Sequence, residues 1–168
     1  ISHRNQQNKS HEIQAYFHAK NLKKAPPHIN NLHLIFSELH KTKALSEEEK
    51  KAWVREHLIQ HTRPLIHARS FIKRYYLLES YNYFISIEDK DNLIRLIQDP
   101  SRIISINATA LSGLLPDGQI YKKIIHIIHQ LDWTSQKLYI AELPDNPTLV
   151  QALKETLSDS NTDLSLRK

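Results

Sequence analysis

The 168-residue chain contains no cysteine and no methionine. The absence of cysteine excludes a disulfide framework, a thiolate zinc site, an iron–sulfur cluster and a cysteine nucleophile. It also suits a reducing environment, so we expect a cytoplasmic protein or one secreted into a reducing compartment. Because the first residue is Ile1 and no methionine follows, we expect the chain to be a fragment of a larger protein.

Glycine and valine are also scarce, with two residues each against 22 leucines and 20 isoleucines. The turns of a β-rich fold depend on glycine, so its scarcity argues against strands and favours helices. No apolar run approaches the ~20 residues that a membrane-spanning helix needs, and no signal peptide pattern is present. We therefore predict an all-α protein without a transmembrane segment.

Acidic residues are scarce in the first half of the chain, so its charge is uneven. Residues 1–78 carry 14 Lys/Arg against 6 Asp/Glu, a net charge of +8, whereas residues 79–168 carry 9 against 12, a net charge of −3. Nine of the eleven histidines also lie in residues 1–78. This half of the protein should therefore attract anionic partners.

The clearest helical pattern lies in residues 119–131. At 100° per residue, its isoleucines, Tyr121 and Leu131 fall in one arc, and its glutamines, lysines and histidines fall in the other. Asp117 precedes this stretch and is the predicted N-cap. Because the apolar arc covers close to half of the circumference, we expect this helix to pack against at least two others.

Capping and helix-breaking residues predict the remaining helices. Ser10 is the expected cap of the first helix, and a second begins at Pro27. Ser46 and Glu49 form a capping box before the third, and Pro64 opens the longest helix, which extends to about residue 80. Residues 81–87 fit either a helix or an irregular segment. Shorter helices are predicted at about 89–98, 101–113, 117–131, 134–143 and 146–158.

The predicted helices indicate one all-helical domain over residues 10–158, with disordered ends at 1–9 and 159–168. Residues 10–80 form a basic helical bundle and residues 81–158 form stacked helical hairpins. The sequence Leu-Pro-Asp at 115–117 occurs again at 143–145, and Ile-Glu-Asp at 87–89 lies one period earlier. This 28-residue spacing is typical of an α-solenoid. The alternative is a chance alignment of amphipathic hairpins.

Histidines and catalytic motifs give little support for a metal or an enzyme. His57 and His61 have the i, i+4 spacing of a chelating pair, and His67 is the nearest third ligand. No HExxH motif accompanies them, and no carboxylate is evident that could orient their rings by a hydrogen bond. The chain also lacks a Gly-rich phosphate loop, a GxSxG motif and a kinase signature. We therefore predict no metal, no cofactor and no identifiable catalytic residue.

The strongest candidate for binding is the basic segment 63–76, which contains no acidic residue. On one long helix its cations would form a stripe able to hold the phosphates of a nucleic acid, an anionic lipid headgroup or an acidic protein surface. The alternative is a solvated helix face. The predicted anion-binding residues are Arg63, His67, Arg69, Lys73 and Arg74.

For the function, we expect a non-catalytic protein–protein interaction or scaffold module, because stacked hairpins present extended surfaces to partner proteins. The alternative is a polyanion-binding domain that uses residues 63–76 to bind a phosphoinositide or a nucleic acid. A helical enzyme domain with scattered catalytic residues is a further alternative. Another protein is therefore the first expected partner, and an anionic lipid or nucleic acid the second.

Overall fold

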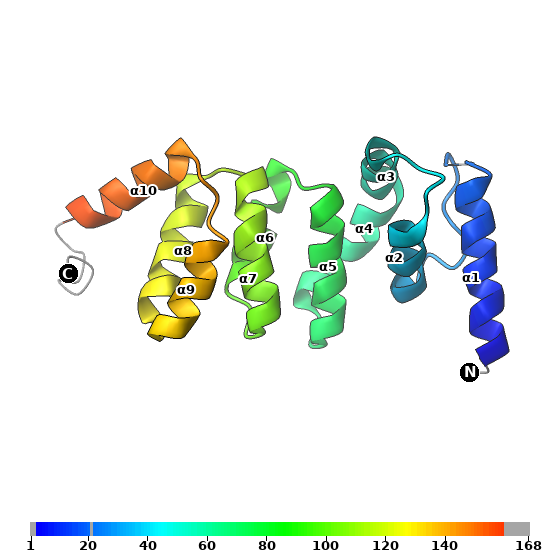
Figure 1. Cartoon of the computed structure of the whole chain (residues 1–168), viewed down its shortest axis with the longest axis horizontal. Helices are drawn as coiled ribbons and strands as arrows, with labels where there is room; N and C mark the ends of the chain where they lie inside the picture. Colours follow the sequence, from blue (N-terminus) through cyan, green and yellow to red (C-terminus); the bar gives the residue numbers. More distant parts are fainter. Residues whose placement is uncertain (1–2, 21, 160–168) are drawn as a thin grey trace. The chain divides into compact units, whose positions relative to one another are not determined.

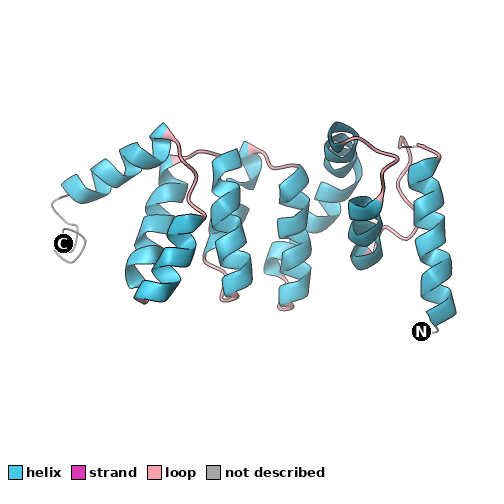
Figure 2. Ribbon diagram, in the orientation of Figure 1, coloured by secondary structure: helices cyan, strands magenta, loops and turns pink. Residues whose placement is uncertain are grey.

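The computed structural model describes residues 3–20 and 22–159. Within these ranges every regular element is a helix and no strand occurs (Figure 2), which confirms the all-α prediction. None of these helices combines the length and the apolar character needed to cross a membrane. Apart from Asp159, the tail predicted to be disordered lies outside the described residues. The chain divides into an N-terminal unit, Ile1–Phe84, and a C-terminal unit, Ile85–Lys168.

The N-terminal unit contains five α-helices joined by loops and short helical turns (Figure 1). A π-helical turn (Val54–Leu58) links α3 to α4, and a 3-10 turn (Arg63–His67) follows α4. The α-helices are α1 (His3–His18), α2 (Leu32–Lys41), α3 (Glu47–Trp53), α4 (Ile59–Thr62) and α5 (Phe71–Tyr83).

Two helix starts differ from the prediction. Helix α1 begins at His3, so Ser10 lies inside it and residues 3–9, which we expected to be disordered, are helical. The Ser10 hydroxyl donates instead to the carboxylate of Glu38 in α2, at 2.8 Å. Helix α2 begins at Leu32 rather than at Pro27, because His28 has left-handed backbone geometry (φ 58°) that interrupts a helix.

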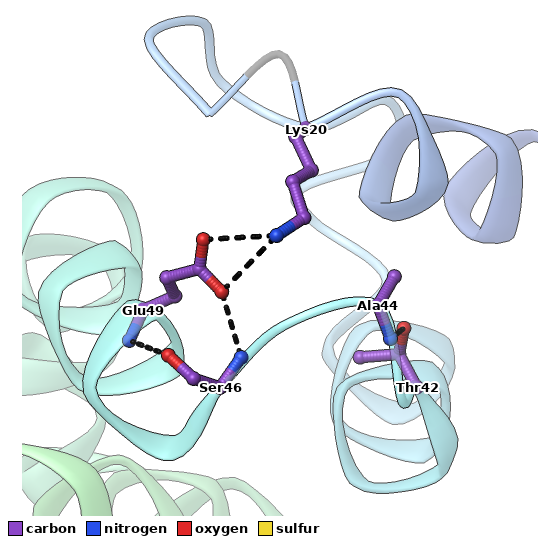
Figure 3. A network of polar contacts seen from close by, with 5 residues as sticks. All are labelled: Lys20, Thr42, Ala44, Ser46 and Glu49. Atoms are coloured by element: carbon purple, nitrogen blue, oxygen red, sulfur yellow. Dashed lines mark hydrogen bonds and ion pairs between the residues drawn. The ribbon is translucent and has the colours of Figure 1, made fainter.

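The predicted capping box before α3 is confirmed (Figure 3). The Ser46 hydroxyl accepts from the Glu49 amide at 3.2 Å, and the Ser46 amide donates to the Glu49 carboxylate at 2.7 Å. Lys20, directly after α1, binds the same carboxylate at 3.1 Å. This network ties the end of α1 to the start of α3.

Aromatic and aliphatic side chains from α1, α2 and α3 form the core of the N-terminal unit. The rings of Phe17 and Trp53 meet edge to face with centroids 5.1 Å apart. The Trp53 indole donates to the Tyr16 hydroxyl at 2.8 Å, which in turn donates to the carbonyl oxygen of Lys24 at 2.6 Å. The buried core residues are Ile13, Phe17, Ile35, Phe36, Leu39, Leu45, Trp53, Val54 and Leu58.

The C-terminal unit consists of stacked helices (Figure 1). Helix α6 (Lys90–Ile97) packs against α7 (Arg102–Leu111), and α8 (Gly118–Gln130) packs against α9 (Trp133–Ala141) and, most extensively, against α10 (Pro147–Ser158). Helix α8 begins 28 residues after α6, but α10 begins 29 residues after α8 and α9 begins 31 residues after α7. A regular 28-residue repeat therefore remains a hypothesis.

Helix α8 has the predicted phase. Ile120, Tyr121 and Ile124 are fully buried, whereas Lys122 and Lys123 are exposed. The helix contacts α6, α9 and α10, as its wide apolar arc predicted. Ile128 is only partly buried, because the apolar contacts of α8 are densest in its first half. The predicted N-cap, Asp117, accepts from the amides of residues 119 and 120 at 2.8 and 3.2 Å.

Candidate ligand pocket in the N-terminal unit

The helix predicted from Pro64 to about residue 80 is interrupted. Ala68 is extended (ψ 136°), and Ser70, which precedes α5, is also extended (ψ 124°). Two extended residues shift the helical register, so Arg63 and His67 do not share a helix face with Arg74. The prediction of one continuous basic stripe is therefore wrong. Whether its five residues bind anions remains a prediction.

The five residues lie in different surroundings. The Arg74 guanidinium donates to the carbonyl oxygens of Ala68 and Arg69, at 2.7 and 3.0 Å, so it closes the loop before α5. Arg63 is partly buried at the start of the 3-10 turn, His67 is exposed at its end, and Arg69 is exposed in the loop that follows. Lys73, on the first turns of α5, is exposed and lines a pocket.

This pocket is open to solvent and has a volume of about 400 Å³. Its wall is built from the loop before α2, the start of α2, and residues of α4, the 3-10 turn and α5. Its lining residues are Ile29, Asn30, Asn31, Leu32, His33, His61, Leu65, Lys73 and Tyr76. The packing of these helices thus brings together side chains that lie between positions 29 and 76 of the sequence.

The floor of the pocket is apolar, and its aromatic side chain is packed against the core. It consists of Ile29, Leu32, Leu65 and the ring of Tyr76, all partly buried. The Tyr76 ring stacks on the buried Phe36 with centroids 5.8 Å apart and an interplanar angle of 7°. Burial raises the pKa of the Tyr76 hydroxyl above its ordinary value. A ligand would meet an aromatic surface that is already in place.

The rim of the pocket is polar and carries positive charge. His33 of α2, His61 of α4 and Lys73 of α5 are all exposed. None of the residues that line the pocket is acidic. The amide oxygen of Asn31 accepts from the Leu34 amide at 3.4 Å, so this side chain is used to cap α2. Among the described residues, the other polar groups at the rim are the amide of Asn30, the imidazoles of His33 and His61, and the ammonium group of Lys73, and all of them can donate a hydrogen bond to an anion.

Side chains of α1 and of the π-helical turn hold the loop that forms one wall of the pocket. The His28 ring lies 2.7 Å from the Glu12 carboxylate. The His57 ring nitrogen lies 2.5 Å from the carbonyl oxygen of Leu22. His28 adopts a left-handed conformation, which is unfavourable for a residue other than glycine. These contacts fix the chain immediately before Ile29.

The two histidines considered as a metal-binding pair lie in different environments. His57 is buried against the loop, whereas His61 lines the pocket. Among the described residues, no three His, Asp or Glu side chains gather as a metal site would require. The imidazole of His57 is instead part of the packing that shapes the pocket wall.

Sequence reasoning identified Lys73 but missed the residues that surround it. His33 is a single histidine in an ordinary amphipathic helix, and Tyr76 is one of two adjacent tyrosines in α5 with no motif around it. The approach of His33 to Lys73 depends on the packing of α2 against α5, for which the sequence carries no local signal.

Comparisons with known proteins provide no relative for this chain. No protein-family model matches it, and no curated protein or solved structure is significantly similar to it. Inferences about its function therefore rest on the chemistry of its own surfaces.

Proposed function

We propose that the chain is a non-catalytic protein-interaction module, whose N-terminal unit binds an acidic segment of a partner protein. The observation that supports this proposal is the pocket beside Lys73, which combines a cationic rim with an apolar floor. A carboxylate of the partner would pair with Lys73, and a neighbouring apolar side chain would contact Leu65 and Tyr76.

The charge of the N-terminal unit favours an acidic partner. Residues 1–84 carry 14 Lys/Arg against 7 Asp/Glu. Complementary charge accelerates association and selects the orientation of binding, while the apolar contacts supply much of the affinity. A volume of about 400 Å³ lies within the range of ordinary ligand pockets and suffices for the side chains of a short peptide.

A polyanion is the second candidate, favoured by the positive charge of the unit. A nucleic acid or a phosphoinositide surface would need several cations in a continuous arrangement. The break at Ala68 removes that arrangement, and the Arg74 guanidinium is held by backbone carbonyls. Phosphate contacts would also leave the apolar floor unused, so the pocket supports the peptide proposal better.

An enzyme has weaker support from the same geometry. A catalytic histidine is usually oriented by a second polar group, most often a carboxylate. The residues that line the pocket include two imidazoles but no carboxylate that could orient either of them. The pocket is therefore better suited to binding than to proton transfer.

The experiment is a titration of the chain with a labelled decapeptide in which glutamate alternates with leucine, followed by NMR of the histidine side chains. We expect binding to shift the ring signals of His33 and His61. Lys73→Glu should abolish these shifts, because reversal of the charge repels the carboxylates. The matched control is Lys43→Glu, since Lys43 is exposed and does not line the pocket.

A second peptide with glutamine in place of glutamate tests the role of the charge and should bind at least tenfold more weakly. Duplex DNA and phosphoinositide vesicles at low salt test the second candidate. If these polyanions shift the ring signals of His33 and His61 and the acidic peptide does not, the polyanion replaces the peptide as the proposed ligand.

A further inference from the structure

A basic surface occurs on helix α8 within an otherwise acidic unit. Residues 85–159 carry seven Lys/Arg against ten Asp/Glu, yet α8 contains no acidic residue. Lys122, Lys123 and His126 of α8 are exposed together on its polar arc. The exposed polar arc of α8 therefore carries two lysines and no carboxylate, although the unit as a whole is acidic.

These side chains border a groove with a volume of about 440 Å³. Ile94 of α6, which is partly buried, forms its apolar part, and Gln119, Lys122, Lys123 and His126 of α8 form the rest. Because lysine stems are aliphatic, they extend the apolar surface around Ile94 while their ammonium groups stay in water. The groove thus has the same chemistry as the pocket of the N-terminal unit.

One carboxylate already occupies the edge of this basic surface. The Glu155 carboxylate of α10 lies 2.7 Å from the Lys122 ammonium. Hydrogen bonds from Lys122 and Gln151 hold the pKa of the Glu155 carboxyl below its ordinary value. Within the described part of the chain Lys123 forms no ion pair, so its exposed ammonium group remains available to a second carboxylate.

We propose that the groove between α6 and α8 is a second binding site for an acidic peptide segment of a partner protein. A carboxylate of the peptide pairs with Lys123, His126 borders the same end, and an apolar side chain of the peptide contacts Ile94. The nature of the partner rests on the proposed function, but the groove is separate from the pocket. With one site in each unit, the chain would bind two acidic peptide segments.

The test is calorimetric titration of the full chain with the glutamate–leucine decapeptide. We expect the wild type to bind two peptides, and Lys73→Glu and Lys123→Glu to bind one each. Binding to the groove should also shift the ring signal of His126. The matched control is Lys137→Glu in α9, which lies outside the groove and should leave two peptides bound.

The variants separate this proposal from the proposed function. If Lys73→Glu removes all binding, the groove is not a site and the pocket proposal stands. If Lys123→Glu removes all binding and Lys73→Glu changes nothing, the groove is the site and the pocket proposal fails. His126→Glu, which adds a negative charge to the same groove, is the second variant should Lys123→Glu unfold. A wild-type chain that binds one peptide without a shift at His126 overturns the second site.

Discussion

The carboxylate of Glu38 offers the sharpest test of how the N-terminal unit is held together. Its residue is 3% exposed, and it accepts hydrogen bonds from the Ser10 hydroxyl at 2.8 Å and the Gln14 amide at 2.7 Å. Both donors belong to α1, whereas Glu38 belongs to α2. The perturbation is Glu38→Gln, which keeps the shape of the side chain, removes its charge and leaves one acceptor oxygen for two donors.

The expected cost follows from these contacts. A hydrogen bond to a charged group contributes about 1.5–3 kcal/mol, and Ser10 and Gln14 are partly exposed, so water compensates part of the loss. We expect Glu38→Gln to lower the free energy of unfolding by about 2 kcal/mol. Glu48→Gln is the control: the Glu48 side chain is 84% exposed and pairs with the half-exposed Lys51, so its loss should lower the free energy of unfolding by less than about 0.5 kcal/mol.

The pH dependence gives this prediction a second readout. Burial raises the pKa of the Glu38 carboxyl, but hydrogen bonds from Gln14 and Ser10, together with Lys41, outweigh burial and hold it below its ordinary value. A lowered pKa contributes stability above the pKa of the unfolded chain, about 4.3, and this stability is lost as pH falls through the folded pKa. The difference between wild type and Glu38→Gln should therefore be full at pH 7 and shrink below about pH 4.

Urea unfolding followed by tryptophan fluorescence measures the difference in stability between wild type and Glu38→Gln, and it reports on the N-terminal unit. Trp53 is 1% exposed in the core of the N-terminal unit, whereas Trp133 of the C-terminal unit is 68% exposed. The fluorescence change on unfolding therefore comes chiefly from Trp53. The reasoning is refuted if Glu38→Gln costs no more than Glu48→Gln, or if the difference between wild type and Glu38→Gln grows as the pH falls.

Two further predictions concern α8 and the segment beside the pocket. Ile124 is fully buried, so Ile124→Ala should lower the free energy of unfolding by about 2–5 kcal/mol. Lys123 is exposed, so Lys123→Ala should lower it by less than about 0.5 kcal/mol. Urea unfolding monitored by circular dichroism at 222 nm measures both values, and equal values would contradict the phase of α8. Arg74→Ala should lower the thermal midpoint and leave peptide affinity unchanged, whereas Lys73→Ala should weaken binding without lowering the midpoint. The opposite pattern in calorimetry would place the binding charge at Arg74.

Local signals account for most of the helices that the sequence predicted. Ser46 and Asp117 cap α3 and α8 as expected, because an N-cap depends only on the next two or three residues. The sequence also predicted which face of α8 is buried, because its 13 residues have one continuous apolar face. The prediction of a helix start was wrong where a residue distant in the sequence determines the local structure. Ser10 looked like a cap, but its hydroxyl is used by Glu38, 28 residues away.

The break at Ala68 shows why the prediction of one continuous helix through residues 63–76 was wrong. Ala68 and Arg69 are good helix formers, and no glycine or proline interrupts residues 65–80. The loop is stabilised by the Arg74 guanidinium, whose hydrogen bonds replace those of a helix at the carbonyl oxygens of residues 68 and 69. Arg74, which the sequence analysis predicted to bind an anion, thus holds the loop that interrupts the predicted helix.

Lys73 and Arg74 are neighbours in the sequence, and both looked equally suited to bind anions. Their roles diverge because successive residues of a helix point about 100° apart, so Lys73 lies over the pocket while Arg74 lies over the preceding loop. The long stem of arginine and its several donors suit it to bridge two carbonyl oxygens, whereas the ammonium of Lys73 stays in solvent beside an apolar floor. The direction of the side chain, rather than the density of positive charge, therefore determines which cation of this segment can meet a ligand.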